Sequence, residues 1–183
     1  PPYSRARMED YDGLGFQSSA SRNLSAYFLE QAIEVTEIGQ VVCQIVPLSL
    51  IYSQRMRTMR DVLYSRCFDI DVEAYDCVPG YMFNQGKIGS NTSTAITQRV
   101  AIITASTGSK ESQRMTSTRL IRWGSDERGT LFESIPRTLI PEMLSADSTI
   151  PLLGDENGKR NYTQAISTGI VLEDILGEGE FTL

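Results

Sequence analysis

The acidic side chains at residues 69–73 are the group in this sequence whose types and spacing could do chemistry. Asp69, Asp71 and Glu73 alternate along the chain, so in an extended strand their carboxylates lie on one face. Three carboxylates on one face could hold a hard cation through their oxygen atoms. The intervening Ile70 and Val72 are apolar, which is the pattern of a strand with one buried face and one solvent face. We therefore predict a solvent face here and no metal site.

The chain contains no histidine, and this excludes several kinds of catalysis at once. Ser-His-Asp and Cys-His nucleophiles, histidine general bases and most transition-metal sites all need an imidazole. The three cysteines, Cys43, Cys67 and Cys77, form no C-x-x-C pair, so we expect neither a zinc site nor a disulfide framework. Residues 154–159 end in a Gly-Lys pair, but their glycines are too close together for a phosphate-binding loop, and we predict a turn. The sequence thus predicts a protein that is not an enzyme and that holds no cofactor.

A group of arginines surrounds a short amphipathic segment, residues 53–66. Met56, Met59 and Leu63 recur there at helical spacing, which predicts a surface helix with one apolar edge. The basic side chains either solvate an exposed face or bind a neighbouring subunit's acids or phosphate, since arginine forms bidentate contacts with both. The candidate residues for contact with a subunit or with RNA are Arg55, Arg57, Arg60 and Arg66.

The charge of the whole chain limits the partners that these arginines could serve. A formal net charge of −6 argues against a dedicated nucleic-acid reader, whose binding depends on a basic excess, although a local basic patch is compatible with it. The hydrophobic content of 40% is that of a folded protein. No stretch reaches the roughly 18 apolar residues of a membrane span.

The elements that would position these residues change in character near residue 53. Residues 1–52 are polar at first, with a short helix predicted from Asn23 or Ser25 to Glu34 and a strand-like run at 41–46, and we predict an extended arm. Strands separated by turns are predicted at 68–74, 81–88, 99–105, 116–123, 130–135 and 165–176. Many strands with one convincing helix favour an antiparallel β-sandwich or barrel.

Met56–Leu63, residues 130–136 and residues 170–181 follow one another along the chain. In this order they resemble segments of the capsid proteins of picorna-like viruses. The stretch from Met56 to Leu63, between arm and strand, is similar to the helix that leads into their jelly roll. Residues 130–136 are similar to a late strand of that family, and residues 170–181 to its final strand with a Gly-acidic-acidic-Phe ending. The resemblance implies a mainly β fold: an antiparallel eight-stranded jelly-roll sandwich at 53–183, with an extended N-terminal arm at 1–52 and a short helix before the first strand.

The same resemblance implies a function in assembly. It predicts a structural capsid protein of a non-enveloped positive-strand RNA virus, which forms an icosahedral shell around the genome. Its partners would be other capsid protein subunits and, through a local basic patch, the genomic RNA, with no membrane contact. It would be found in the virion and, during assembly, in the host cytoplasm.

Two alternatives from other classes stay open. One is a matrix-type adaptor protein of an enveloped RNA virus, in which a basic patch meets membrane or nucleocapsid; the net charge of −6 counts against it. The other is a stand-alone β-sandwich binding module with its site in loops, to which a long polar arm would be surplus.

Overall fold

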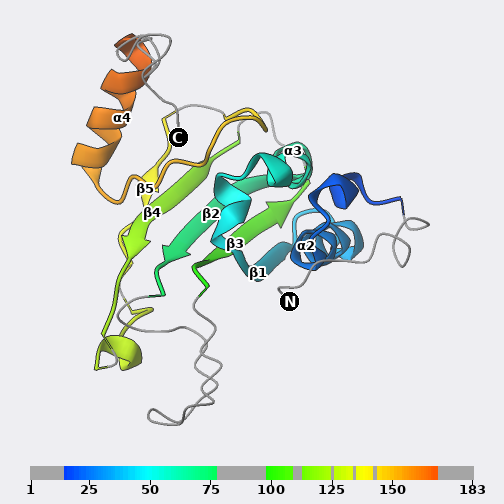
Figure 1. The fold of residues 1–183 in the computed structure, drawn as a ribbon, viewed down its shortest axis with the longest axis horizontal. Coiled ribbons are helices and arrows are strands. Elements are labelled where there is room, and N and C mark those ends of the chain that lie inside the picture. The colour runs from blue at the N-terminus through cyan, green and yellow to red at the C-terminus, as the bar shows by residue number, and fades with distance from the viewer. Residues whose placement is uncertain are drawn as a thin grey trace, which may run out of the picture.

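A computed structural model describes residues 15–77, 98–108, 113–124, 126–133, 135–141 and 144–168. These residues form one open five-stranded sheet with helices beside it (Figure 1). The strands are β1 (Val41–Pro47), β2 (Cys67–Tyr75), β3 (Val100–Thr107), β4 (Met115–Ile121) and β5 (Thr138–Leu139).

The sheet has the strand order β1-β3-β2-β4-β5 and mixed directions. β3 runs antiparallel to both β1 and β2, and β5 antiparallel to β4, whereas β2 and β4 are parallel. The ladder between β2 and β3 shifts register between Phe68 and Asp71, and Asp69 has a φ of 47° at that point. This bulge ends the regular pairing at the beginning of β2.

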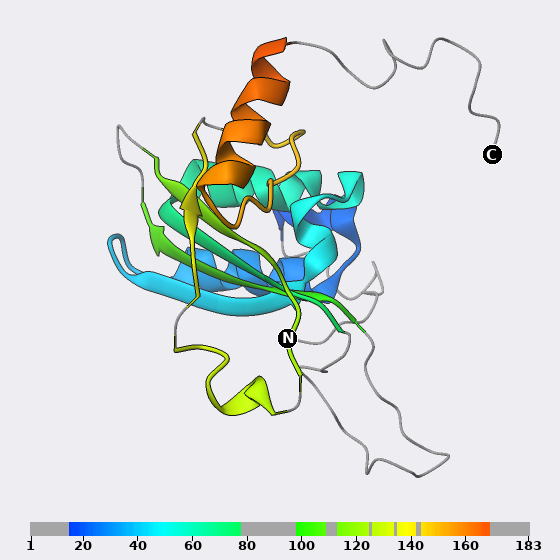
Figure 2. The same ribbon diagram turned by 90° about the vertical axis from the view of Figure 1, so that its left-hand side faces the viewer.

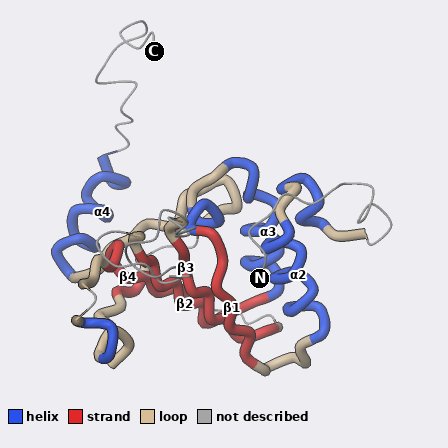
Figure 3. Tube along the Cα trace, turned by 60° about the horizontal axis from the view of Figure 1, so that its bottom comes forward, coloured by secondary structure: helices blue, strands red, loops and turns tan. Residues whose placement is uncertain are grey.

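The helices gather at two ends of the sheet. Figure 1 and Figure 3 place α2 at the β1 end and α4 near β4 and β5. Figure 2 shows α3 above the strands. The α-helices are α2 (Leu24–Val35), α3 (Arg57–Arg66) and α4 (Glu156–Thr168), and the short 3₁₀ helices are η2 (Gln17–Ser21), η3 (Leu48–Ile51), η4 (Gln54–Met56) and η5 (Glu127–Gly129).

Local sequence explains where α2 begins and which side it buries. The side chain of Asn23 accepts a hydrogen bond from the backbone N–H of Ser25 at 2.9 Å, which caps the first turn. Ala26, Leu29 and Ile33 then recur at helical spacing and are buried. The predicted helix and its cap at Asn23 are confirmed.

The main core lies between one face of the sheet and the helices α2 and α3. Alternate residues of the strands point to this face, so that every second side chain is buried. The helices add Leu29 from α2 and Met59 and Leu63 from α3. The residues that β1, β2 and β3 contribute to this cluster include Val42, Val46, Ile70, Val72, Ala74, Ala101, Ile103 and Ala105.

Among the residues that the structure describes, the opposite face of the sheet is covered only at one end. Tyr75, Val100 and Trp123 form a second buried cluster there, and Leu131 and Ile135 pack against it from the segment between β4 and β5. Nearer the beginning of β1, Val41 and Cys43 on this face are exposed. The sheet therefore has one helix-covered face and one partly open face.

The predicted eight-stranded jelly-roll sandwich is wrong. The described residues hold a single sheet, its two central strands β2 and β4 are parallel, and helices take the place of a second sheet. The alternation in residues 68–74 correctly indicated a strand with one buried face. It could not indicate whether a sheet or a pair of helices covers that face, because both present apolar side chains to it.

The extended N-terminal arm in that fold prediction is also wrong for residues 24–51. Leu29 and Ile33 of α2, Val46 of β1 and Leu50 of η3 belong to the same core cluster as α3 and β2. The mixture of a short helix, a polar turn and a seven-residue strand made this segment look weakly structured. Many of its apolar residues pack in this core, whereas Phe28, Val35, Ile38 and Val41 are exposed.

Three strand predictions have different outcomes. Thr130 to Glu133 form a turn, in which the backbone N–H of Glu133 donates to the carbonyl of Thr130 at 3.0 Å, so the strand at 130–135 is wrong there. The turn at 154–159 and the start of the strand at 165–176 are replaced by α4. The strand at 81–88 and residues 169–183 lie outside the described residues. No helix in the described ranges combines the length and the apolarity of a membrane span.

Candidate interaction surfaces

The four arginines selected from the sequence lie in different environments around α3. Arg57 is exposed and its Nε lies 2.7 Å from the carboxylate of Asp147. Arg66, in the last turn of α3, pairs with Glu34 of α2. Arg55 is exposed on η4. Arg60 is completely buried.

Arg60 holds three backbone segments together inside the protein. Its Nη1 donates to the carbonyl oxygens of Leu50 at 3.0 Å and Ser53 at 2.8 Å, and its Nε donates to that of Ala146 at 2.9 Å. Burial lowers the pKa of the guanidinium from its ordinary value. These contacts join η3 and residue 146 to α3. The subunit or RNA contact that we predicted for the other three arginines stays a prediction.

An additional arginine lies beside this group and was not selected from the sequence. Arg22 follows η2, which packs against both α3 and η4, and its side chain is exposed. We call Arg22, Arg55 and Arg57 the arginine group. Asp147 offsets the charge of Arg57, which leaves Arg22 and Arg55 as its two cations without a described carboxylate within ion-pair distance. Their spacing in sequence gave no signal of this proximity.

The alternating carboxylates of β2 make internal pairs. Arg137 pairs with Glu73 and lies 4.0 Å from the carboxylate of Asp71. The hydroxyl of Tyr75 donates to Glu73 at 2.6 Å. Burial raises the pKa of Asp71, and Arg137 opposes that shift. Asp69 is exposed at the bulge, and no cluster of three metal-ligating side chains exists among the described residues.

Asp76 is a buried carboxylate that pairs with two arginines, and no sequence pattern predicted it. Its side chain is 2% exposed at the end of β2. One oxygen accepts from Nε of Arg99 at 2.9 Å and from the N–H of Cys77 at 2.8 Å, and the other accepts from Nε of Arg122 at 2.8 Å. These bonds lower its pKa to about 2, with Arg99 as the largest cause. Because Arg99 precedes β3 and Arg122 follows β4, Asp76 clamps three strand ends together.

β1 is an edge strand whose residues divide into two sets. The N–H of Thr107 donates to the carbonyl of Gln40 at 2.9 Å, and the N–H of Leu48 donates to that of Arg99 at 3.0 Å. In an antiparallel ladder, residues that bond to a neighbour alternate with residues that point away from it. The even-numbered residues from Gln40 to Leu48 therefore face β3.

The odd-numbered residues of β1 consequently present their backbone groups to the free edge of the sheet. These are Val41, Cys43 and Ile45, since Pro47 has no N–H to offer. Within the described chain no other segment bonds to these groups. An unpaired strand edge of this kind is a template for another strand.

Exposed apolar side chains occur near the start of β1 in the sequence. Val35 at the end of α2 is 70% exposed, Ile38 in the following turn 87% and Val41 61%. Ile38 lies beside Gly108 at the end of β3, so Val41 is the one of the three that belongs to the free edge. β1 contains no charged residue, and its register with β3 is continuous. We call the free edge of Val41, Cys43 and Ile45 the edge surface. It lacks the charges and bulges by which proteins usually protect an edge strand.

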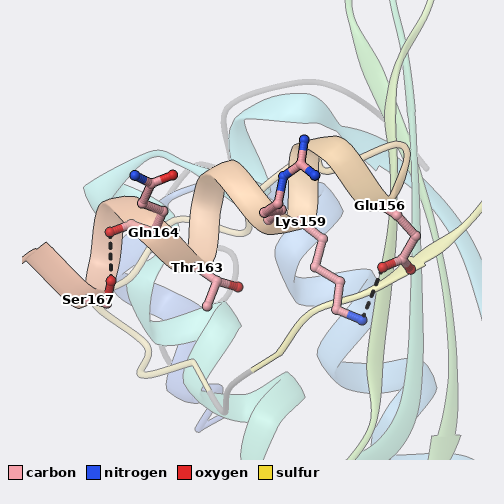
Figure 4. A pocket seen from close by; sticks show the side chains of 6 residues that line it. Glu156, Lys159, Thr163, Gln164 and Ser167 are labelled. Carbon is pink, nitrogen blue, oxygen red and sulfur yellow. Dashed lines mark hydrogen bonds and ion pairs between the residues drawn. The ribbon is translucent and has the colours of Figure 1, made fainter.

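α4 carries a shallow polar hollow that brings no reactive groups together (Figure 4). Lys159 pairs with Glu156 at 3.6 Å, and the hydroxyl of Ser167 donates to the carbonyl of Gln164 at 2.9 Å. All of the lining residues come from the one helix. The hollow is a surface of α4 and does not resemble an active site.

A scan of known family models and searches of curated proteins and of solved structures found no match to this chain.

Proposed function

We propose that this chain is a matrix-type adaptor protein of an enveloped RNA virus. Its work is structural: it associates with other protein through the edge surface and with an anionic phospholipid membrane through the arginine group. The observation that carries the proposal is the open edge of β1, which is uncharged and has exposed Val41 at its beginning. Such an edge costs solubility unless another chain covers it.

The arginine group supplies the second contact that an adaptor needs. Arg22 and Arg55 lie on neighbouring elements, and guanidinium groups bind phosphate oxygens in pairs of hydrogen bonds. Each basic residue near an anionic bilayer contributes about 1 kcal/mol of binding free energy. The net charge of −6 opposes binding of the whole chain to an anionic bilayer, so the contact depends on these local cations.

The role in an icosahedral capsid is the other proposal, and it has lost its main support. The resemblance that implied it also implied a jelly roll, whereas the sheet observed here has one layer and a parallel pairing of β2 with β4. A capsid protein would sediment from its native source as a particle that contains RNA and sister subunits. Sedimentation therefore separates this proposal from the adaptor.

Vesicle flotation tests the adaptor directly. The full chain is mixed with vesicles of phosphatidylcholine alone or with added phosphatidylserine, and we expect flotation only with the anionic lipid and less at high salt. Removing both cations in Arg22→Gln/Arg55→Gln should weaken binding by about 30-fold, which corresponds to about 2 kcal/mol. The matched control Lys159→Gln/Arg160→Gln removes the same charge from α4 and should float as before.

Two results would overturn this assignment. In the first, the chain does not float with anionic vesicles at low salt. In the second, both double variants lose binding equally, which would make the effect one of total charge. Binding to single-stranded RNA without flotation would move the arginine group from a membrane to an RNA contact and would also reject the proposal.

A further inference from the structure

The edge surface is self-complementary, and this identifies what covers it. Three outward residues of β1, Val41, Cys43 and Ile45, each offer one N–H and one C=O. Two such edges can run antiparallel with a two-fold axis through Cys43. Cys43 then exchanges both hydrogen bonds with Cys43 of the second copy, and Val41 exchanges both with Ile45.

Other registers satisfy fewer of these groups. A two-fold axis at Ile45 would place Cys43 opposite Pro47, which has no N–H to donate. An axis at Val41 would place Ile45 opposite Glu37, which precedes the strand. Only the axis at Cys43 pairs every outward donor and acceptor of the three residues.

The side chains favour the same partner. In this register Val41 lies opposite Ile45 on the open face of the sheet, where apolar cross-strand pairs stabilise an antiparallel ladder. β1 has no charge, so a second copy meets no like-charge repulsion along the strand. Exposed Ile38 precedes the strand and exposed Tyr52 follows it, and the start of one β1 lies near the end of the other.

We infer that two copies of this chain associate through antiparallel pairing of β1 with β1, centred on Cys43, so that their sheets become continuous. The inference deepens the proposed function, on which it rests, by naming the protein partner of the edge surface. The paired segment is seven residues long in each copy, so the interface falls in the small, transient class. We expect a dissociation constant on the order of 10 µM.

Disulfide trapping reads the register. Opposite residues in a hydrogen-bonded pair have Cα atoms about 5.5 Å apart, which suits a disulfide bond. In a Cys77→Ser background, mild oxidation should cross-link two copies through Cys43, and Cys43→Ser should abolish the product. With Cys43→Ser present, Val41→Cys alone should not cross-link, whereas Val41→Cys with Ile45→Cys should.

Sedimentation equilibrium of the full chain gives the affinity. Val41→Glu places a charge at the interface on an exposed side chain, and we expect at least a tenfold weaker dimer. Ile166→Glu makes the same change on the exposed face of α4 and should leave the dimer unchanged. Both substitutions are at exposed positions, so loss of folding would not explain a difference between them.

Several outcomes would overturn the inference. The first is a chain that stays monomeric at protein concentrations up to about 100-fold above the expected dissociation constant. The second is efficient cross-linking by Val41→Cys alone. The third is an equal effect of Val41→Glu and Ile166→Glu on the dimer. Edge amides of β1 that resist hydrogen exchange equally at every protein concentration would place a segment of the same chain on the edge. A chain that is monomeric but floats with arginine-dependent affinity would reject the dimer and leave the adaptor standing.

Discussion

The hydrogen bonds and ion pairs of Asp76 should contribute to the unfolding free energy of the protein, and substitution of Asp76 measures that contribution. Asp76→Asn keeps the size of the side chain but removes the charge that Arg99 and Arg122 face. The pKa of Asp76 is about 2 in the folded protein against an ordinary 3.8. A folded-state pKa below the ordinary value means that the ionised carboxylate stabilises the folded state. That stabilisation is complete above about pH 4 and is lost as the pH falls through about 2.

The magnitude follows from the size of the shift. A change from 3.8 to about 2 corresponds to roughly 2.4 kcal/mol of unfolding free energy at 1.36 kcal/mol per unit. Arg99 and Arg122 are 56% and 68% exposed, so water and salt screen both pairs. We therefore expect Asp76→Asn to destabilise the protein by about 1–2 kcal/mol at pH 7.

Urea unfolding of the natural chain and of Asp76→Asn at a series of pH values measures this contribution. The difference in unfolding free energy should be constant from pH 7 to about 4 and should shrink toward zero near pH 2. Asp61→Asn on the exposed side of α3 is the matched control and should change stability by less than about 0.5 kcal/mol. A difference that persists unchanged at pH 2, or an Asp76→Asn protein as stable as the natural one at pH 7, would refute the clamp.

The buried groups give further predictions. Arg60→Met keeps the apolar stem but leaves three carbonyl oxygens without their donor, and urea unfolding should show a loss of about 2–4 kcal/mol; a loss below about 1 kcal/mol would contradict the internal role. Gly154→Ala adds a Cβ at a φ of 71° and 2.6 Å from Cβ of Arg119, so thermal unfolding should report a lower midpoint, and an unchanged midpoint would contradict that packing. A thiol reagent at pH 8 should modify exposed Cys43 rapidly and Cys67 only on unfolding, because burial raises the pKa of Cys67 to about 11; equal rates in the native protein would show that Cys67 is accessible.

Hydrophobic periodicity predicted the helix and the strand in the central part of the chain. It failed for elements that have no regular pattern of buried residues. The helix predicted within residues 53–66 and the strand predicted at 68–74 came from 3.6-residue and two-residue patterns, and α3 (Arg57–Arg66) and β2 (Cys67–Tyr75) confirm both. α4 has no buried residue, so its sequence has no apolar face that would indicate a helix. Its first residues were interpreted as a turn because of Gly154 and Gly158. Hydrophobic periodicity indicates which residues are buried, so it gives little signal for a helix that is exposed on all sides.

The pairing of β2 with β4 could not be predicted for a different reason. The direction in which a strand joins a sheet is set by the connections and packing around it, and its own residue pattern carries no such information. β2 pairs with β3 in the antiparallel direction on one edge and with β4 in the parallel direction on the other. Nothing in either strand's composition states this order.

The sequence indicated some of the side chains of the candidate surfaces but not where they lie in the fold. The arginines near α3 were identified, but Arg60 carries the same charge as its neighbours and lies in the core, where it serves the backbone. Its position four residues after Met56 and three before Leu63, on the apolar side of the helix, was the available signal. Arg22 and Asp76 were missed because their partners are distant in sequence.

Pairing through the edge surface would determine how the arginine groups of two copies are oriented. The two-fold axis of an antiparallel strand pair is perpendicular to the sheet, so both copies would place their α3 layers on the same side of the continuous sheet. Both arginine groups would then face one membrane, and two weak contacts joined in one dimer bind more tightly than either does alone. It follows that Val41→Glu, which lies on the opposite face from α3, should lower the apparent membrane affinity above the dimer dissociation constant and leave it unchanged well below that concentration. Flotation at two protein concentrations separates these regimes, and an equal loss at both would mean that Val41 contacts the membrane itself.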